Sequence, residues 1–216
     1  MQGTIHPKQI KRFYHKENLK SIAVKKVNFI IDGMNIFHAV KEKFGTNWLN
    51  IDLNKLVRQI SLNDENILSI KFFVSPFVGN TNLAQIQREF IERNSKLSHV
   101  DLKLGVFRKR IIKCQKCTNQ VVHYQEKHTD INIALEISRS AIDKSIDKIY
   151  LITADDDFKP AIASFNQIAP NKKFVRVLPP GRFSASSESY IHLNKSIIKK
   201  SQFNVSSAAS PRHTLQ

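Results

Sequence analysis

The 216-residue sequence predicts an α/β fold in which helices cover both faces of a mainly parallel central sheet. Continuous apolar runs, typical of strands that are buried on both faces, recur along the chain. Between them lie segments whose apolar residues are spaced three and four apart, which indicates amphipathic helices. Alternation of these two patterns is typical of doubly wound sheets.

The first half of the chain contains two strands and two helices. The runs KVNFIID, residues 26–32, and NILSIKFFV, residues 66–74, predict the strands. A long helix is predicted for NLAQIQREFIERNSKL, residues 82–97. The helix between the strands is indicated by apolar residues at positions i, i+3, i+4 and i+7, namely Leu53, Leu56, Val57 and Ile60.

The second half begins with a long strand that becomes increasingly basic, DLKLGVFRKRIIKC, residues 101–114. The segment QVVHYQEK, residues 120–127, is predicted to pair back on it. Three further elements follow: a strand at 147–153, a helix at 157–168 and a strand at 172–178. A helix before them is indicated by the spacing of Ile131, Ala134, Leu135, Ser138 and Ile142.

These elements predict one domain, residues 25–200, between two polar ends. Residues 1–24 form a basic N-terminal extension, and the small polar residues of 201–216 predict a disordered tail. Between residue 178 and this tail we expect a turn, a short helix and a closing element.

Charge and cysteine content restrict the function. The chain has 34 Lys and Arg against 18 Asp and Glu, a net charge of +16, which favours a polyanionic partner, with nucleic acid ahead of an anionic membrane. No stretch approaches the roughly 20 apolar residues of a transmembrane helix, and the N-terminus lacks the apolar region of a signal peptide. Two closely spaced cysteines cannot form a disulfide framework, so we expect an intracellular, cytoplasmic protein.

Acidic residues follow two predicted strands directly, and another opens a helix. Asp32 ends the first strand, Asp130 opens a helix, and Asp155, Asp156 and Asp157 follow the strand at 147–153. Each has an ordinary interpretation, because Asp favours turns and helix N-termini. Open α/β sheets, however, bind ligands at the carboxyl ends of their strands, where these acids converge.

Clustered carboxylates repel one another unless a cation neutralises them. Their hard oxygen atoms suit Mg²⁺ or Mn²⁺, which proteins hold through a few carboxylates, waters and substrate phosphates. In a strongly basic chain, such a cation beside a polyanion indicates phosphoryl transfer, because the cation activates water and stabilises charge on the scissile phosphate.

Three segments, FIIDGMNIF, EKHTDINIALEI and LITADDDFKPAI, resemble in order and spacing the three motifs of the NYN domain, the LabA-like branch of the PIN-like nuclease superfamily. The resemblance covers roughly residues 25–200. It implies a three-layer α/β/α PIN-like (Rossmann-like) sandwich and a metal-dependent endoribonuclease. PIN-like proteins often pair up, so a homodimer is a further expectation.

The resemblance also implies the site, residue by residue. Asp32, Asp130, Asp155 and Asp157 would be the catalytic acids and the ligands of Mg²⁺ or Mn²⁺. Asn35 would position a water molecule or a substrate phosphate.

The segment TADDDF departs from the family's Ser-Gly-Asp-Ser-Asp-Phe pattern. Thr153 takes the first Ser position and is expected to bond a ligand or to cap. Ala154 replaces Gly and would destabilise the turn if a positive φ were needed there. Asp156 takes the second Ser position, and in an extended segment its side chain would point away from its two neighbours. We therefore expect Asp156 to be peripheral.

Residues 103–126 form a predicted basic ribbon interrupted by the sequence CQKC. Cys114 and Cys117 could bind Zn²⁺ with His123 as a third ligand and His128 as a fourth. The alternative is a pair of reduced cysteines at a hairpin tip.

Basic residues with interleaved aromatic rings, as in this ribbon, suit single-stranded RNA. The rings would be Phe107 and Tyr124, although Phe107 could instead belong to the core and the charges could simply be solvated. The RNA-binding candidates are Lys103, Arg108, Lys109, Arg110, Lys113 and Lys116.

The sequence is therefore compatible with three functions. The first is a metal-dependent ribonuclease that hydrolyses RNA phosphodiester bonds, and the second is a non-catalytic RNA-binding module of the same fold. The third is a phosphatase with a D-x-D nucleophile, to which Asp155 and Asp157 fit, although the usual Thr or Val does not follow and Asp32 would lack a role. A Toprim-type domain also uses D-x-D, but it requires a Glu where this chain has Asp32.

Overall fold

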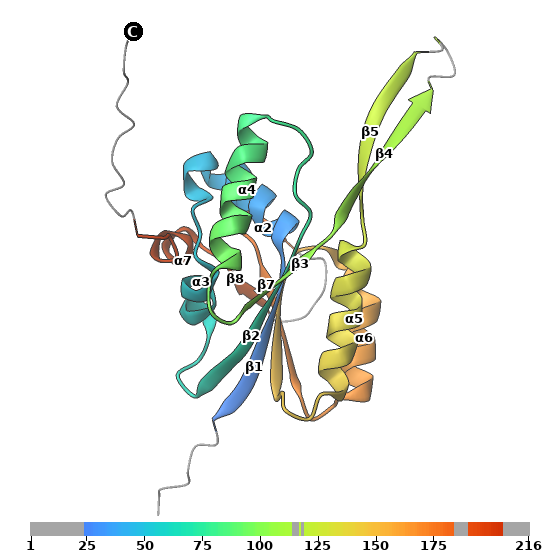
Figure 1. The fold of residues 1–216 in the computed structure, drawn as a ribbon. Coiled ribbons are helices and arrows are strands. Elements are labelled where there is room, and N and C mark those ends of the chain that lie inside the picture. The colour runs from blue at the N-terminus through green and yellow to red at the C-terminus, as the bar shows by residue number, and fades with distance from the viewer. Residues whose placement is uncertain (1–23, 114–116, 118, 184–189, 205–216) are drawn as a thin grey trace, which may run out of the picture.

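The computed structural model describes residues 24–113, 117, 119–183 and 190–204 (Figure 1). The expected N-terminal extension and polar tail lie outside these residues, apart from residue 24 and residues 201–204. In the part of the chain that the structure describes, no helix is long and apolar enough to cross a membrane.

The central sheet has six strands in the order β3-β2-β1-β6-β7-β8, and every neighbouring pair is parallel. All carboxyl ends therefore lie at one edge of the sheet. The predicted class, a mainly parallel sheet within an α/β/α sandwich, is confirmed. The strands are β1 (Lys25–Asp32), β2 (Glu65–Val74), β3 (Val100–Leu104), β6 (Lys148–Ile152), β7 (Lys173–Leu178) and β8 (Tyr190–His192).

Helices cover both faces of this sheet (Figure 1). On one face lie α2 (Gly33–Phe44), α3 (Leu53–Ile60), α4 (Asn82–Ser95) and α7 (Lys195–Lys200). On the other lie α5 (Thr129–Ile142) and α6 (Lys159–Ile168). Two short 3₁₀ turns, η1 (Thr46–Trp48) and η2 (Asp156–Phe158), connect elements.

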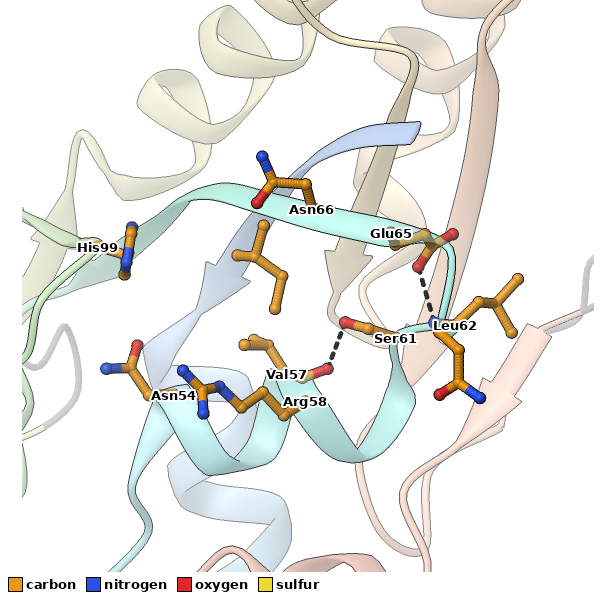
Figure 2. A pocket seen from close by; sticks show the side chains of 10 residues that line it. Asn54, Val57, Arg58, Ser61, Leu62, Glu65, Asn66 and His99 are labelled. Atoms are coloured by element: carbon orange, nitrogen blue, oxygen red, sulfur yellow. Dashed lines mark hydrogen bonds between the residues drawn. The ribbon is translucent and has the colours of Figure 1, made fainter. Parts of the chain in front are cut away.

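At the amino edge of the sheet, three donors surround the Glu65 carboxylate. The Glu65 carboxylate accepts hydrogen bonds from the Lys148 ammonium (2.6 Å), the Tyr150 hydroxyl (2.7 Å) and the Leu62 backbone N–H (2.9 Å). Beside it, a hollow of about 320 Å³ lies between α3, the start of β2 and His99 (Figure 2). The hollow is remote from the acids at the carboxyl edge of the sheet.

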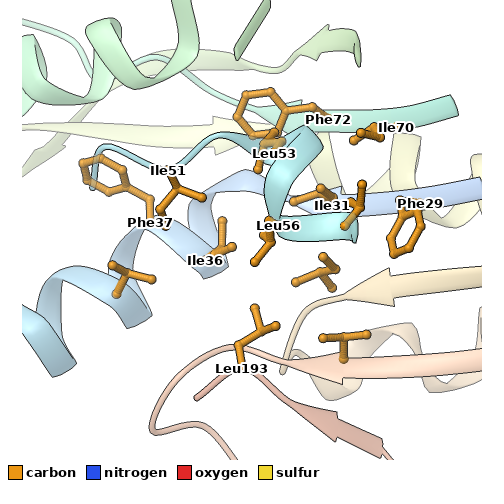
Figure 3. Close-up of a cluster of buried hydrophobic side chains, with 14 of the residues drawn as sticks. Phe29, Ile31, Ile36, Phe37, Ile51, Leu53, Leu56, Ile70, Phe72 and Leu193 are labelled. Atoms are coloured by element: carbon orange, nitrogen blue, oxygen red, sulfur yellow. The ribbon is translucent and has the colours of Figure 1, made fainter. Parts of the chain in front are cut away.

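The core is divided by the sheet, because successive residues of a strand face opposite sides. Phe29 and Ile31 of β1 pack with α2 and α3 (Figure 3). Ile30 packs with α5 and α6 on the other face. Such burial on both faces explains why three consecutive residues of β1, Phe29, Ile30 and Ile31, are apolar.

The predicted strand at 101–114 is in fact two strands. β3 belongs to the central sheet, and β4 (Val106–Lys113) forms an antiparallel hairpin with β5 (Gln120–Lys127) that projects from the body (Figure 1). The division falls at the buried Gly105, where an added methyl group would overlap the hydroxyl groups of Ser75 and Thr129.

Helix α5 buries a different face from the one its spacing predicted. Ile131, Leu135 and Ile142 are exposed, whereas Ile133 and Ile137 are fully buried. Apolar residues occur on two sides of this helix, so the periodicity fits two orientations. Docking against β1, β2 and α6 selects one of them.

Candidate active site

Asp32 stands where β1 ends and α2 begins. One carboxylate oxygen accepts a hydrogen bond from the Asn35 backbone N–H (3.0 Å), which caps the helix. The other accepts a hydrogen bond from the Thr153 hydroxyl (2.9 Å). With 6% of its surface exposed, Asp32 is the most deeply placed acid of the predicted set.

Two side chains join this helix start to the loop after β6. Thr153, which is fully buried, also accepts a hydrogen bond from the Asp155 backbone N–H (3.1 Å). Asn35 accepts one from the Ala154 N–H through its side-chain oxygen (3.0 Å). Ala154 is not among the residues with positive φ, so its replacement of Gly strains nothing.

The three consecutive aspartates have different surroundings. Asp155 is half-buried and accepts a hydrogen bond from the Asp157 N–H (2.9 Å), and Asp157 itself is exposed. Asp156 instead pairs with Arg176 (2.9 Å) and Lys159 (2.9 Å). Its carboxylate is therefore bound to cationic side chains, whereas Asp155 and Asp157 belong to the acidic group described below.

Arg176 is buried under the loop 153–156 and donates hydrogen bonds to it. Its guanidinium group is 1% exposed and donates hydrogen bonds to the Asp155 carbonyl (2.7 Å) and to Asp156 (2.9 Å). A longer bond reaches the Thr153 carbonyl (3.4 Å). Because five fixed donors can bind several acceptors at once, a single arginine can fix the loop that carries the aspartates.

Asp130 lies in the first turn of α5, and Glu126 lies at the end of β5. Glu126 accepts a hydrogen bond from the Ser75 hydroxyl (2.9 Å), which also contacts the Thr129 hydroxyl (3.2 Å). The two acids line a hollow of about 240 Å³ at the base of the hairpin.

Electrostatic interactions connect all of these acids. Burial raises the pKa of Asp32 from 3.8 to about 6, and the charges of Asp130 and Glu126 add to this effect against the two hydrogen bonds. Desolvation also raises the pKa of Asp130 and is the largest cause. The negative charges of Glu126, Asp155 and Asp157 raise this pKa further. We call Asp32, Glu126, Asp130, Asp155 and Asp157 the acid cluster.

The donor chemistry of the acid cluster fits a hard divalent cation, because every side chain offers carboxylate oxygens and their mutual repulsion favours a positive charge. Among the described residues, no three His, Cys, Asp or Glu side chains are already grouped as ligands of one ion. Asp32, Asp130, Asp155 and Asp157 are the residues that would hold Mg²⁺ or Mn²⁺.

The predicted ribbon residues lie on two different elements. Lys103 belongs to β3 and pairs with Asp101 (2.9 Å) instead of lying in the hairpin. Arg108, Lys109, Arg110 and Lys113 lie on β4 and are exposed, and Lys116 lies outside the described residues.

The zinc prediction falls largely outside the described residues. Cys114 and the side chain of His123 are not described, and Cys117 is exposed near the tip of the hairpin. His128 cannot join them, because it follows the base of the hairpin and the strands rise about 3.3 Å per residue over eight paired residues. A zinc site of Cys114, Cys117 and His123 stays a prediction.

Sequence reasoning missed three contributors to this site. Glu126 is one, although it is the first residue of the EKHTD segment that ends in Asp130. Arg176 is another, and its signal was a charged residue inside the otherwise apolar run KKFVRVL. Ser75 had no signal in the sequence, because its role depends on the approach of the hairpin.

Replacing Arg176 by Met is expected to destabilise the protein by about 2–3 kcal/mol, because two backbone carbonyls and a carboxylate lose a buried donor. Asp156→Asn, whose side chain is 37% exposed and keeps part of its hydrogen bonding, should lose less than about 1 kcal/mol. Urea denaturation measures both. A larger loss for Asp156→Asn would show that the ion pair, not the carbonyl bonds, anchors the loop.

Comparison with known proteins assigns the chain to a family. The sequence profile of the NYN domain matches residues 26–188, which include all five residues of the acid cluster. None of the curated proteins compared with the chain matches it.

A crystal structure of a protein of unknown function from Vibrio parahaemolyticus is similar in fold, with a TM-score of 0.54 and 19% sequence identity. The similarity covers 82% of this chain and 98% of that one. Because the NYN profile spans well over half of its residues, this chain belongs to the NYN domain family, whose fold is the nuclease-type, PIN-like fold.

Proposed function

We propose that this protein is a metal-dependent ribonuclease that hydrolyses RNA phosphodiester bonds at the acid cluster. One observation carries the proposal: carboxylates from three separate segments meet at the carboxyl edge of a parallel sheet, and burial and mutual repulsion raise the pKa of two of them. Membership of the NYN family, whose fold is that of nucleases, supports the same reaction class.

In the part of the chain that the structure describes, the aspartates of the acid cluster lack basic partners, and the charges of neighbouring acids raise the pKa of Asp32 and Asp130. Within the described residues, Asp32, Asp130, Asp155 and Asp157 form no salt bridge with Lys or Arg, although the chain has a net charge of +16. Glu65, in contrast, is paired. An unpaired acidic group in so basic a protein is expected where a metal ion must bind.

The residues of the chain would contribute by holding the carboxylates in place. Asn35 N–H and the Thr153 hydroxyl orient both oxygens of Asp32, and Thr153 connects Asp32 to the backbone of Asp155. When bound, Mg²⁺ or Mn²⁺ would supply an activated water and stabilise charge on the scissile phosphate. Since the pKa of Asp32 is about 6, binding of the cation must displace a proton in weakly acidic solution.

The exposed basic residues of the hairpin would attract the polyanionic substrate. Single-stranded RNA is favoured, because its unpaired bases can stack on aromatic side chains while the phosphates meet Lys and Arg. Binding should therefore weaken steeply as the salt concentration rises.

Incubation with single-stranded RNA, duplex RNA and single-stranded DNA, each with Mn²⁺, Mg²⁺ or EDTA, tests the proposal. We expect cleavage of single-stranded RNA that requires the divalent cation. The Asp155→Asn variant should lose cleavage by on the order of 10²-fold or more, as is typical when one charge-stabilising group is removed from an active site.

Asp101→Asn is the matched control, because it likewise replaces one aspartate by asparagine but lies outside the acid cluster, where Asp101 pairs with Lys71 and Lys103. It should cleave normally. Cleavage that survives both EDTA and Asp155→Asn contradicts the proposal, and binding of RNA without any cleavage would identify an RNA-binding module of the same fold.

A further inference from the structure

Three half-buried aromatic rings form a row beside the acid cluster. His38 of α2 lies 5.7 Å from Phe77, and Phe77 lies 6.4 Å from Phe107 of β4, measured between ring centroids. We call these three residues the ring row. They come from three separate parts of the chain, so only the folded structure brings them together.

The register of the hairpin fixes which of its faces continues the ring row. Phe107 pairs directly with Glu126, and directly opposed residues of an antiparallel pair project from the same face. Since Glu126 interacts with Asp130 and Asp32, this face is the one turned toward the acid cluster.

The next pair on the same face, two residues farther from the base, is Lys109 and Tyr124. Both side chains are exposed, and Tyr124 is 44% exposed. Arg108 and Arg110 project from the opposite face. The face that leads away from the acid cluster thus carries one cationic and two aromatic side chains in sequence.

Phe77, the middle ring of the ring row, is anchored through its backbone and its ring. The backbone N–H of Phe77 donates to the side-chain oxygen of the buried Gln87 (2.6 Å), whose amide nitrogen donates to the Ser75 carbonyl (3.2 Å). The ring of Phe77 also packs edge-on against the buried Phe37 at 5.8 Å. Rings that are fixed before a ligand binds lose little conformational freedom on binding.

His38 suits a stacking role in its neutral form. Burial lowers its pKa, and the nearby charge of Lys41 lowers it further. A neutral imidazole can stack on a base without the cost of removing a charged ring from water.

We propose that the ring row, together with Lys109 and Tyr124, is a track on which unpaired bases of single-stranded RNA stack as the strand approaches the acid cluster. The role given to the track, which is to guide RNA to a cleavage site, rests on the proposed ribonuclease function. Base stacking on the rings would fix the path of the strand, and Lys109 would contact a phosphate.

The test measures binding in the Asp155→Asn background by fluorescence anisotropy, so that no cleavage interferes. The probes are a labelled oligouridylate and an abasic ribose-phosphate oligomer of the same length. The double variant Phe77→Leu/Phe107→Leu keeps apolar volume but removes two rings, and it should bind oligouridylate at least about tenfold more weakly, with the abasic oligomer unaffected.

Phe203→Leu is the matched control, because that half-buried ring packs under the Arg93 guanidinium (4.1 Å) and not against the ring row. It should change binding less than about twofold. Thermal unfolding checks that the variants fold. If the double variant does not fold, the Tyr124→Ser variant tests the track instead, because Tyr124 is exposed. Its affinity for oligouridylate should fall by about fivefold.

Equal affinity of the background protein for the abasic and the base-bearing oligomer would overturn the track, as would unchanged binding by the ring variants. Tighter binding of duplex than of single-stranded RNA would overturn it as well. Failure of the ribonuclease proposal can be told apart from failure of the track. If the wild-type protein does not cleave RNA but binds it in a ring-dependent way, the track stands and only the proposed cleavage is wrong.

Discussion

Replacing Asp32 by Asn is expected to abolish RNA cleavage and, at the same time, to stabilise the metal-free protein at neutral pH. Cleavage should fall by on the order of 10²–10³-fold, because the substitution removes the most deeply buried negative charge of the acid cluster. One local hydrogen bond can persist, since the new amide oxygen still accepts from Asn35 N–H. The other would reverse, because the amide nitrogen would donate to the Thr153 hydroxyl, which donates to Asp32 in the wild type.

The gain in stability follows from the raised pKa of Asp32. A carboxyl group that titrates near 6 in the folded protein and near 3.8 in the unfolded chain stabilises the fold below about pH 3.8. That stability is lost as the pH rises through about 6, because the folded state must then bury a charge. The loss amounts to about 3 kcal/mol at neutral pH, at 1.4 kcal/mol per pKa unit, and the uncharged amide of the Asp32→Asn variant would not incur it.

Urea denaturation in EDTA at pH 5 and pH 7.5 measures this effect. The advantage of Asp32→Asn over the wild type should grow with pH and should shrink when Mn²⁺ is added, because the cation stabilises only a protein that binds it. Asp52→Asn is the control, since Asp52 also caps a helix, α3, but lies outside the acid cluster. A variant that is less stable than the wild type at pH 7.5 would contradict the assigned burial cost.

Much of the fold follows from the sequence, because strands buried on both faces are largely apolar. The runs at 26–32 and 66–74 are therefore predicted to within a residue or so of β1 and β2. The division at Gly105 could not be predicted, because the extended pattern continues through it. It arises from the close approach of Ser75 and Thr129, which are distant in the sequence.

The candidate site shows the same limit. The four aspartates were predicted to converge because the carboxyl ends of parallel strands share one edge, and the structure brings them into one acid cluster. Their catalytic role stays a prediction. Glu126 could not be added from sequence, since a shift of one residue in the β4–β5 register would turn its side chain to the other face.

Buried acids at the two ends of the sheet strands have opposite charged neighbours. At the amino edge, Glu65 is fully enclosed and satisfied by Lys148, Tyr150 and a backbone N–H. At the carboxyl edge, Asp32 is almost as enclosed but has only acids as charged neighbours. A fold that can pair a buried carboxylate with lysine does not do so at Asp32, and this contrast favours a functional origin for the acid cluster.

Replacing Glu65 by Ala should therefore be among the most destabilising substitutions in the chain. The side chains of Glu65 and Lys148 are 0% and 4% exposed, so the variant leaves a buried ammonium group with no carboxylate. Loss of one partner of a buried ion pair costs about 3–5 kcal/mol. Tyr150→Phe removes only one hydroxyl from the network and should cost about 1 kcal/mol in the same urea denaturation experiment.

The double variant Glu65→Leu/Lys148→Met separates the cost of an unpaired charge from the worth of the pair. Apolar side chains of similar volume should restore most of the stability, because a buried ion pair gains little over good packing once desolvation is included. Asp101→Asn, which breaks a half-exposed pair with Lys71, should cost less than about 1 kcal/mol. If the double variant is as unstable as Glu65→Ala, the network at the amino edge holds the strands through its hydrogen bonds and not merely through neutralised charge.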